Sequence, residues 1–163
     1  MLEVGSFSSP AGIWRRGEDA ERWDRFPVPA YLIDAGRERI LVDSGLHPAA
    51  VADPAAHYGG AESLAVFRLE QEASVAERVD LSTVTRVVIT HLHFDHAGGL
   101  ELLPPSVPVV IQRREWEAAH EADAIARNPH RRSNPSPRVS APPATHDANL
   151  TARIEAEPVS LPR

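Results

Sequence analysis

The stretch from His91 to His96 reads His-Leu-His-Phe-Asp-His and constrains this chain more than any other feature. Directly after the apolar run at 87–89, it places four side chains with nitrogen or oxygen donor atoms within six residues. Imidazole nitrogens and carboxylate oxygens are ligands that zinc and similar divalent ions accept. A polar loop that is His-rich by chance is the alternative, but three of the chain's eight histidines fall in this pattern. The pattern therefore predicts a metal site at the end of a buried strand.

The spacing within this stretch divides the donors into two pairs. Alternate side chains of an extended backbone share a face, so His91 and His93 are expected to hold one ion together. Asp95 and His96 follow a change of chain direction and are expected to hold a second ion nearby. Asp95 is also the candidate catalytic residue, because a carboxylate beside an activated water can accept its proton.

Composition predicts a single globular domain with a sizeable core. The 163 residues are 42% hydrophobic and 25% charged, which is ordinary for such a domain. The formal net charge of -6 argues against nucleic acid or an anionic membrane as a partner, because both attract basic patches. The chain has no cysteine, so any metal ligands have to be histidines and carboxylates.

No targeting or membrane segment is visible in the sequence. The first 12 residues lack the basic cluster and apolar run of a secretory signal. No apolar run approaches the roughly 20 residues that a membrane helix needs. We therefore expect a cytoplasmic protein whose partner is a small molecule.

Apolar patterning alternates between strand-like and helix-like segments, which indicates α/β architecture. Two short apolar runs flank Gly36 and predict a hairpin, whereas residues 47–60 contain prolines and glycines and predict an irregular loop. The spacing of Leu69, Ala73, Ala76 and Val79 predicts a helical face. Strands are expected at 30–33, 39–42, 86–90 and 107–112, and helices at 63–79, 97–103 and 113–127.

The last 36 residues differ from the rest of the chain. Residues 128–163 contain seven prolines and no aromatic residue, and their five arginines against three acids give a charge of +2. Such a composition blocks helices and strand ladders. The sequence therefore predicts an ordered domain at residues 1–127 and a disordered Pro/Arg/Ser-rich tail at 128–163.

The His91–His96 pattern, H-x-H-x-D-H, resembles the signature of the metallo-β-lactamase superfamily. The segments Pro-Val-Pro-Ala-Tyr-Leu-Ile-Asp at 27–34 and Arg-Ile-Leu-Val-Asp-Ser-Gly-Leu-His-Pro at 39–48 resemble the opening hairpin of that fold. The residue sequences of these segments, together with His-Leu-His-Phe-Asp-His-Ala-Gly-Gly at 91–99, are most similar to the N-acyl homoserine lactonase-like branch. The likeness covers about residues 1 to 127.

This resemblance implies the N-terminal half of an αββα sandwich that binds two divalent metal ions, by expectation zinc. His91, His93, Asp95 and His96 match the family's metal ligands. The implied activity is that of a zinc-dependent hydrolase, which opens cyclic esters such as acyl homoserine lactones with metal-bound hydroxide. Thioester, phosphodiester and β-lactam substrates remain open, as do iron, manganese and cobalt in place of zinc.

The family's further ligands are not recognisable downstream. They are a histidine in a T-P-G-H-type motif, a bridging aspartate and a final histidine, whereas His130 and His146 here follow neither an apolar strand nor a glycine turn. All 17 basic residues are arginine, as in a GC-rich gene, and we expect a truncated or frameshifted chain after about residue 127. The alternatives to an active enzyme are a catalytically inactive remnant with at most weak metal binding, and a homo-oligomer whose second chain completes the site.

Asp43 matches the aspartate that the family places after its second strand. There it orients a ligand histidine, although an aspartate that simply ends a strand in an Asp-Ser-Gly turn is an equal alternative. Gly98 and Gly99 are expected either to allow close backbone approach beside the metal loop or to form an ordinary turn.

Four other polar aromatic side chains are expected to have no ligand role. His47 is assigned a structural role in its loop, because a lone histidine is a weak ligand signal. His57 and Tyr58 are assigned to a surface loop, although they could contact substrate. His120 is expected on the solvated face of a helix.

Overall fold

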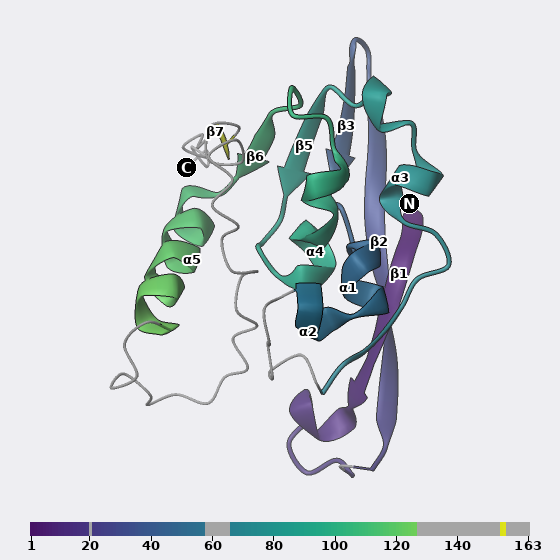
Figure 1. Cartoon of the computed structure of the whole chain (residues 1–163), viewed down its shortest axis with the longest axis vertical. Coiled ribbons are helices and arrows are strands. Elements are labelled where there is room, and N and C mark those ends of the chain that lie inside the picture. The colour runs from purple at the N-terminus through teal and green to yellow at the C-terminus, as the bar shows by residue number, and fades with distance from the viewer. Residues whose placement is uncertain (20, 58–65, 127–153, 156–163) are drawn as a thin grey trace, which may run out of the picture.

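The computed structural model describes residues 1–19, 21–57, 66–126 and 154–155, which build one mixed sheet with short helices packed against it (Figure 1). The sheet has seven strands in the order β4-β1-β2-β3-β5-β6-β7. The expected α/β fold is therefore confirmed. The strands are β1 (Leu2–Pro10), β2 (Trp23–Ala35), β3 (Glu38–Val42), β4 (Arg68–Glu70), β5 (Arg86–Ile89), β6 (Val109–Ile111) and β7 (Ile154–Glu155).

The first half of the sheet is antiparallel and depends on the long strand β2. Its first part pairs with β1, and its last part, from Tyr31 to Ala35, pairs with β3 in the hairpin expected around Gly36. Gly36 has a φ of 67°, a left-handed conformation that glycine adopts without steric cost. Strand β4 extends this half by pairing with β1.

The second half of the sheet is parallel: β5 pairs with β3, β6 with β5, and β7 with β6. Parallel neighbours end at the same edge, and Val42 of β3 lies opposite Val88 of β5. The residues that follow these two strands, Asp43 and the His91–His96 loop, are consequently placed side by side. This topology assembles the candidate site.

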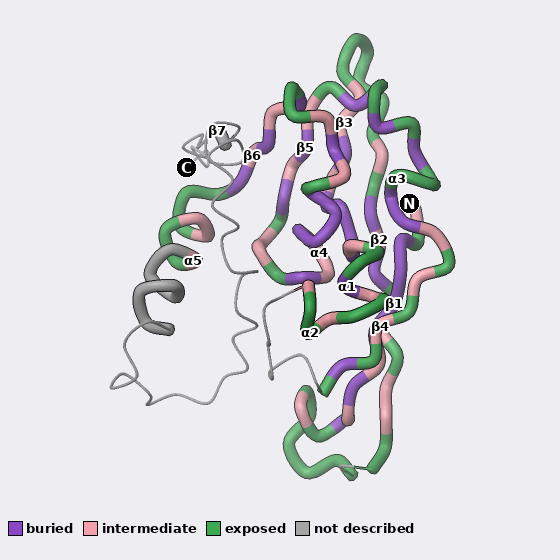
Figure 2. The backbone as a smooth tube through the Cα atoms, viewed as in Figure 1, coloured by how far each residue is buried: buried purple, intermediate pink, exposed green. Residues whose placement is uncertain are grey.

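Among the described residues, helices cover one face of the sheet and leave much of the other exposed. Helices α1 (Pro48–Ala52) and α4 (Phe94–Ala97) lie on the same side of it (Figure 1). Alternate residues are buried in β5 and β6, whereas Val4 to Phe7 of β1 are buried without a break; Figure 2 shows buried residues in β1, β5 and around α4. On the opposite face Tyr31 and Ile33 are 43% and 47% exposed. Their cross-strand partners Val42 and Ile40 are only partly buried.

The remaining helices are short except for one. They are α2 (Pro54–His57), α3 (Val75–Arg78), α5 (Arg113–Ala126) and the 3-10 helices η1 (Ala11–Ile13), η3 (Leu81–Thr83) and η4 (Gly98–Leu102). None of the described helices is long and apolar enough to cross a membrane. Helix α5 and strand β6 agree closely with the sequence-based expectations, and α4 with η4 replaces the expected helix at 97–103.

Two expectations from the sequence were wrong. The helix expected at 63–79 is replaced by strand β4 and the one-turn helix α3, with residues 58–65 outside the described ranges. Leu69 pairs with Phe7 across β1 and β4, so sheet pairing outweighs the helical spacing of the apolar residues. The loop expected at 47–60 contains helices α1 and α2, because prolines occupy the first position of both, where no backbone donor is lost.

Two positions of the expected disordered tail, 154 and 155, lie within the described ranges. Ile154 pairs with Val109, and Glu155 with Val110, so this part of the segment forms a strand. Residues 128–153 and 156–163 lie outside the described ranges. The domain division at residue 127 therefore stays a prediction.

Candidate metal centre

Phe94 anchors the motif in the core. It is 3% exposed, and its ring lies 5.7 Å from that of Phe7 and 5.4 Å from that of Phe67. Trp14 and Phe26 complete this aromatic cluster at one end of the sheet. Because the aromatic side chain points inward, the loop on one side and α4 on the other carry the flanking donor side chains towards the surface.

His91 and His93 face each other across a short gap. The Nε2 atom of His91 lies 3.0 Å from Nδ1 of His93. Two nitrogens bound tetrahedrally to one zinc ion, at its usual bond length, are about 3.3 Å apart. This spacing and the donor chemistry fit a single ion held between the two rings.

Asp95 and His96 form a second pair on the first turn of α4. Oδ2 of Asp95 lies 3.3 Å from Nε2 of His96. The ring of His96 also lies 4.0 Å, centroid to centroid, from that of His91. The two donor pairs are therefore adjacent, and the change of direction expected between them occurs at the start of α4.

Asp43 is a buried carboxylate that holds Thr90 and His96 in place through hydrogen bonds. It is 4% exposed and accepts hydrogen bonds from the backbone N–H of Thr90 at 2.8 Å and from the Thr90 hydroxyl. It also lies 2.8 Å from Nδ1 of His96. Once Nδ1 of His96 donates to Asp43, Nε2 is the ring nitrogen left for a metal. These contacts favour the orienting role of Asp43 over a simple strand end.

The electrostatics follow from these contacts. Burial alone would raise the pKa of Asp43, but its hydrogen bonds with His96 and Thr90 lower it. Burial opposes the charge on His96, yet its hydrogen bonds to Asp43 and Asp95 raise its pKa to about 9. Burial, then the charges of His96 and His93, lowers the pKa of His91, which therefore offers a neutral ring.

The backbone of the turn after β3 packs directly against the motif. Ser44 donates its N–H to the carbonyl of His96 at 2.7 Å, and Gly99 donates to the carbonyl of Gly45 at 2.9 Å. A Cβ on Gly98 would lie 2.9 Å from the Gly45 carbonyl oxygen, and one on Gly99 would collide with that of Ser44. Both glycines therefore serve the close backbone approach.

His47 has the structural role expected from the sequence. Its Nδ1 accepts the N–H of Ala49 at 3.1 Å and caps α1, and its ring stacks on that of His57 at 4.5 Å. Burial and the neighbouring His57 lower the pKa of His47, which suits a ring that accepts a hydrogen bond. Tyr58 and the side chain of His120 lie outside what the structure describes.

Within the described ranges, no three His, Cys, Asp or Glu side chains are placed to hold one ion together. The motif supplies two pairs, and His130 and His146 lie outside these ranges. Sequence reasoning missed two residues of the site. Thr90 binds Asp43, and Glu115 accepts the N–H of Leu92 at 3.0 Å from α5. Neither contact has a signature in residue spacing, because both depend on how distant segments pack.

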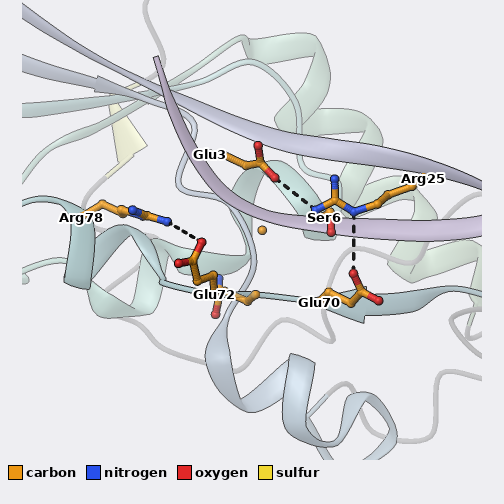
Figure 3. Close-up of a pocket in the computed structure, with 8 residues that line it drawn as sticks. Glu3, Ser6, Arg25, Glu70, Glu72 and Arg78 are labelled. Carbon is orange, nitrogen blue, oxygen red and sulfur yellow. Dashed lines mark hydrogen bonds and ion pairs between the residues drawn. The ribbon is translucent and has the colours of Figure 1, made fainter.

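A surface pocket of about 420 Å³ lies elsewhere, beside β1 and β4 (Figure 3). Its charged side chains are paired: Arg25 contacts Glu3 at 3.2 Å and Glu70 at 3.7 Å, and another ion pair joins Arg78 to Glu72. No donor of the metal motif lines it. This pocket is therefore separate from the candidate metal centre.

Comparison with known proteins agrees with the fold and the motif. The family model described as the metallo-beta-lactamase superfamily matches residues 23–162. An N-acyl homoserine lactonase of Azorhizobium caulinodans is 34% identical over 132 residues, which cover 77% of this chain and 49% of that protein. An N-acyl homoserine lactonase of Bacillus cereus is 34% identical over 99 residues, covering 57% of this chain and 39% of the relative.

Solved structures resemble the chain in fold. A quorum-quenching N-acyl homoserine lactone hydrolase superposes with a TM-score of 0.58 at 23% identity, covering 73% of this chain and 47% of the other. A probable metal-dependent hydrolase from Staphylococcus aureus gives a TM-score of 0.63 at 18% identity, covering 96% of this chain and 57% of the other.

The fold and the paired donors define an α/β domain with a candidate metal site. Since the family model matches most of its length, the chain belongs to the metallo-β-lactamase superfamily. That match continues past residue 127, so the likeness extends further than the motifs alone indicate. The chain spans about half the length of the curated relatives that it matches.

Proposed function

We propose that this chain carries the metal-binding half of a lactonase-like hydrolase, which opens cyclic esters such as acyl homoserine lactones. The observation that carries the proposal is the pairing of donors, His91 with His93 and Asp95 with His96, at spacings of 3.0 and 3.3 Å. The relatives named as N-acyl homoserine lactonases support acyl homoserine lactones as the substrate class. We further propose that the protein is cytoplasmic, and the net charge of -6 supports the absence of nucleic acid and anionic membrane partners.

Each donor has a distinct task in this proposal. His91 and His93 would hold one divalent ion, by preference zinc, and Asp95 and His96 a second. Ions bound by these residues would supply a water of lowered pKa and a Lewis acid for the ester carbonyl. Asp43 would fix the ring of His96, and Asp95 would accept the proton of the attacking water.

The second candidate is an inactive remnant that binds metal weakly. It is favoured by the donor count, because each pair supplies two ligands, whereas catalytic zinc sites usually have three protein ligands. A homo-oligomer in which a second chain supplies the missing ligands is a third candidate.

Metal content and activity, measured together, separate these candidates. The purified chain is loaded with zinc, fractionated by gel filtration and analysed for metal, and each fraction is assayed with an acyl homoserine lactone. About two ions per chain together with lactone opening are expected for the hydrolase. Confinement of metal and activity to a dimer fraction would support the homo-oligomer.

The matched control removes the first donor pair by H91A and H93A and should lose both metal and activity. Near-zero metal in the unsubstituted chain, or metal without lactone opening, would contradict the proposal and support the remnant. A control variant that retains activity would contradict the assigned donors.

A further inference from the structure

Two carboxylates from distant segments hold the backbone of the metal loop. Asp43, after β3, accepts the N–H of Thr90, and Glu115, in the first turn of α5, accepts the N–H of Leu92. The second contact measures 3.0 Å and joins residues 23 positions apart. Leu92 is the residue between His91 and His93, and its N–H belongs to the peptide unit that follows His91, so Glu115 binds the backbone between the two histidines of the first donor pair.

This peptide needs an external partner. Strand β5 ends at Ile89 and α4 begins at Phe94, so the N–H of Leu92 belongs to neither a ladder nor a helix. A partly buried N–H without an acceptor is costly, and an ionised carboxylate gives a stronger hydrogen bond than a neutral one. Glu115 is half-buried, and so is the neighbouring Trp116, whose side chain packs against the core and holds the first turn of α5 in place.

The orientation of this peptide sets the directions of both imidazoles. Leu92 packs its side chain against the core, while His91 and His93 leave the backbone on either side of it. A rotation of the peptide at Leu92 would therefore separate Nε2 of His91 from Nδ1 of His93. With the N–H of Leu92 fixed by Glu115 and its side chain fixed by the core, little such rotation remains.

We infer that Glu115 is a positioning residue for the first metal ion, acting through the Leu92 peptide rather than by touching the ion. This inference rests on the proposed function, because it assigns Glu115 to the same metal centre. The alternative is that Glu115 only stabilises α5, since an acid in the first turn interacts favourably with the helix dipole.

The two roles differ in what a glutamine should do. The amide oxygen of E115Q can still accept the N–H of Leu92 but carries no charge for the helix dipole, whereas E115A provides neither. The matched control is E117A, which removes an exposed carboxylate from the same helix. Each variant of the full chain is titrated with Co²⁺, and the visible absorption of the bound ion is recorded.

We expect E115A to weaken binding of the first Co²⁺ by about 10- to 100-fold and to change its visible spectrum, as for other residues that orient metal ligands. E115Q, whose neutral amide oxygen makes a weaker hydrogen bond, should lose clearly less than E115A, and E117A should keep the affinity and spectrum of the unsubstituted chain. The inference is overturned if E115A binds Co²⁺ normally, if E115Q is as defective as E115A, or if E117A loses as much.

Amide hydrogen exchange in the metal-free protein tests the contact independently. The N–H of Leu92 should exchange slowly in the unsubstituted chain and in E115Q, and much faster in E115A. Equal exchange in all three would overturn the inference. Failure of the unsubstituted chain to bind Co²⁺ would instead contradict the proposed metal centre, so the two failures are distinguishable.

Discussion

Replacing Asp43 should reveal how much of the metal loop depends on a single buried carboxylate. Asp43 is 4% exposed, has a φ of 59° and serves three donor groups: the Thr90 N–H, the Thr90 hydroxyl and His96 Nδ1. In D43N the side-chain oxygen can still accept from Thr90, and asparagine tolerates the left-handed backbone as aspartate does. The amide nitrogen, however, would face the Nδ1–H of His96.

The expected cost of D43N is the loss of one charge-assisted hydrogen bond, about 1.5–3 kcal/mol of unfolding free energy. D43A leaves all three donors without an acceptor and should cost about 3–5 kcal/mol, the range for breaking a buried charged pair. D43N should also lower the pKa of His96 from its raised value of about 9, because the neutral amide no longer stabilises the imidazolium.

Urea unfolding of the metal-free chain measures the stability change, and nitrogen chemical shifts of the His96 ring followed against pH report its pKa. The matched control is D34N, which removes an aspartate with a 76% exposed side chain that pairs with Arg39 at 3.3 Å. It should change stability by at most about 1 kcal/mol. Equal stability of D43N and the unsubstituted chain, or equal costs for D43N and D43A, would refute this account of Asp43.

Three further predictions concern the core, the open face and a helix cap. F94A should destabilise the chain by about 3–5 kcal/mol in urea unfolding, because the ring is 3% exposed. F94L keeps a large apolar side chain and should cost less. A smaller cost for F94A than for F94L would contradict the anchoring role of Phe94. I33T on the open sheet face should reduce binding of a hydrophobic dye without lowering the melting temperature, and an unchanged dye signal would show that the face is covered. Glu77 accepts the N–H and hydroxyl of Ser74, which lowers its pKa. Its contribution to stability is therefore present above the pKa of an unfolded glutamate and is lost as the pH falls through the lower folded value. The melting temperature should fall more with acidification in the unsubstituted chain than in E77Q, which keeps the other carboxylates of lowered pKa such as Asp43; an equal fall in both would contradict the role of Glu77.

The sequence predicted the parts of the fold that rest on local patterning. The hairpin around Gly36, strand β6 and helix α5 each have a clear apolar period or turn residue, and they form where expected. The expectation failed at 63–79, where Leu69 lies in β4 rather than in a helix. A helical spacing of apolar residues does not determine structure when a nearby edge strand offers backbone partners, and that competition is not visible in local sequence.

The metal motif was visible in the sequence because its four donors lie within six residues of one another. Their arrangement as two pairs also follows from local geometry, the extended segment before Phe94 and the helical turn after it. Whether these pairs hold metal stays a prediction.

Only the tertiary structure decided which residues hold the motif in place. Asp43 is 53 positions from His96, and Glu115 is 23 positions from Leu92. The parallel pairing of β3 with β5 brings Asp43 to the loop, and the start of α5 after β6 brings Glu115 to it. Donor chemistry is a property of residue types and can be read from the chain, whereas hydrogen bonds between distant residues exist only once the strands and helices that carry them have packed together.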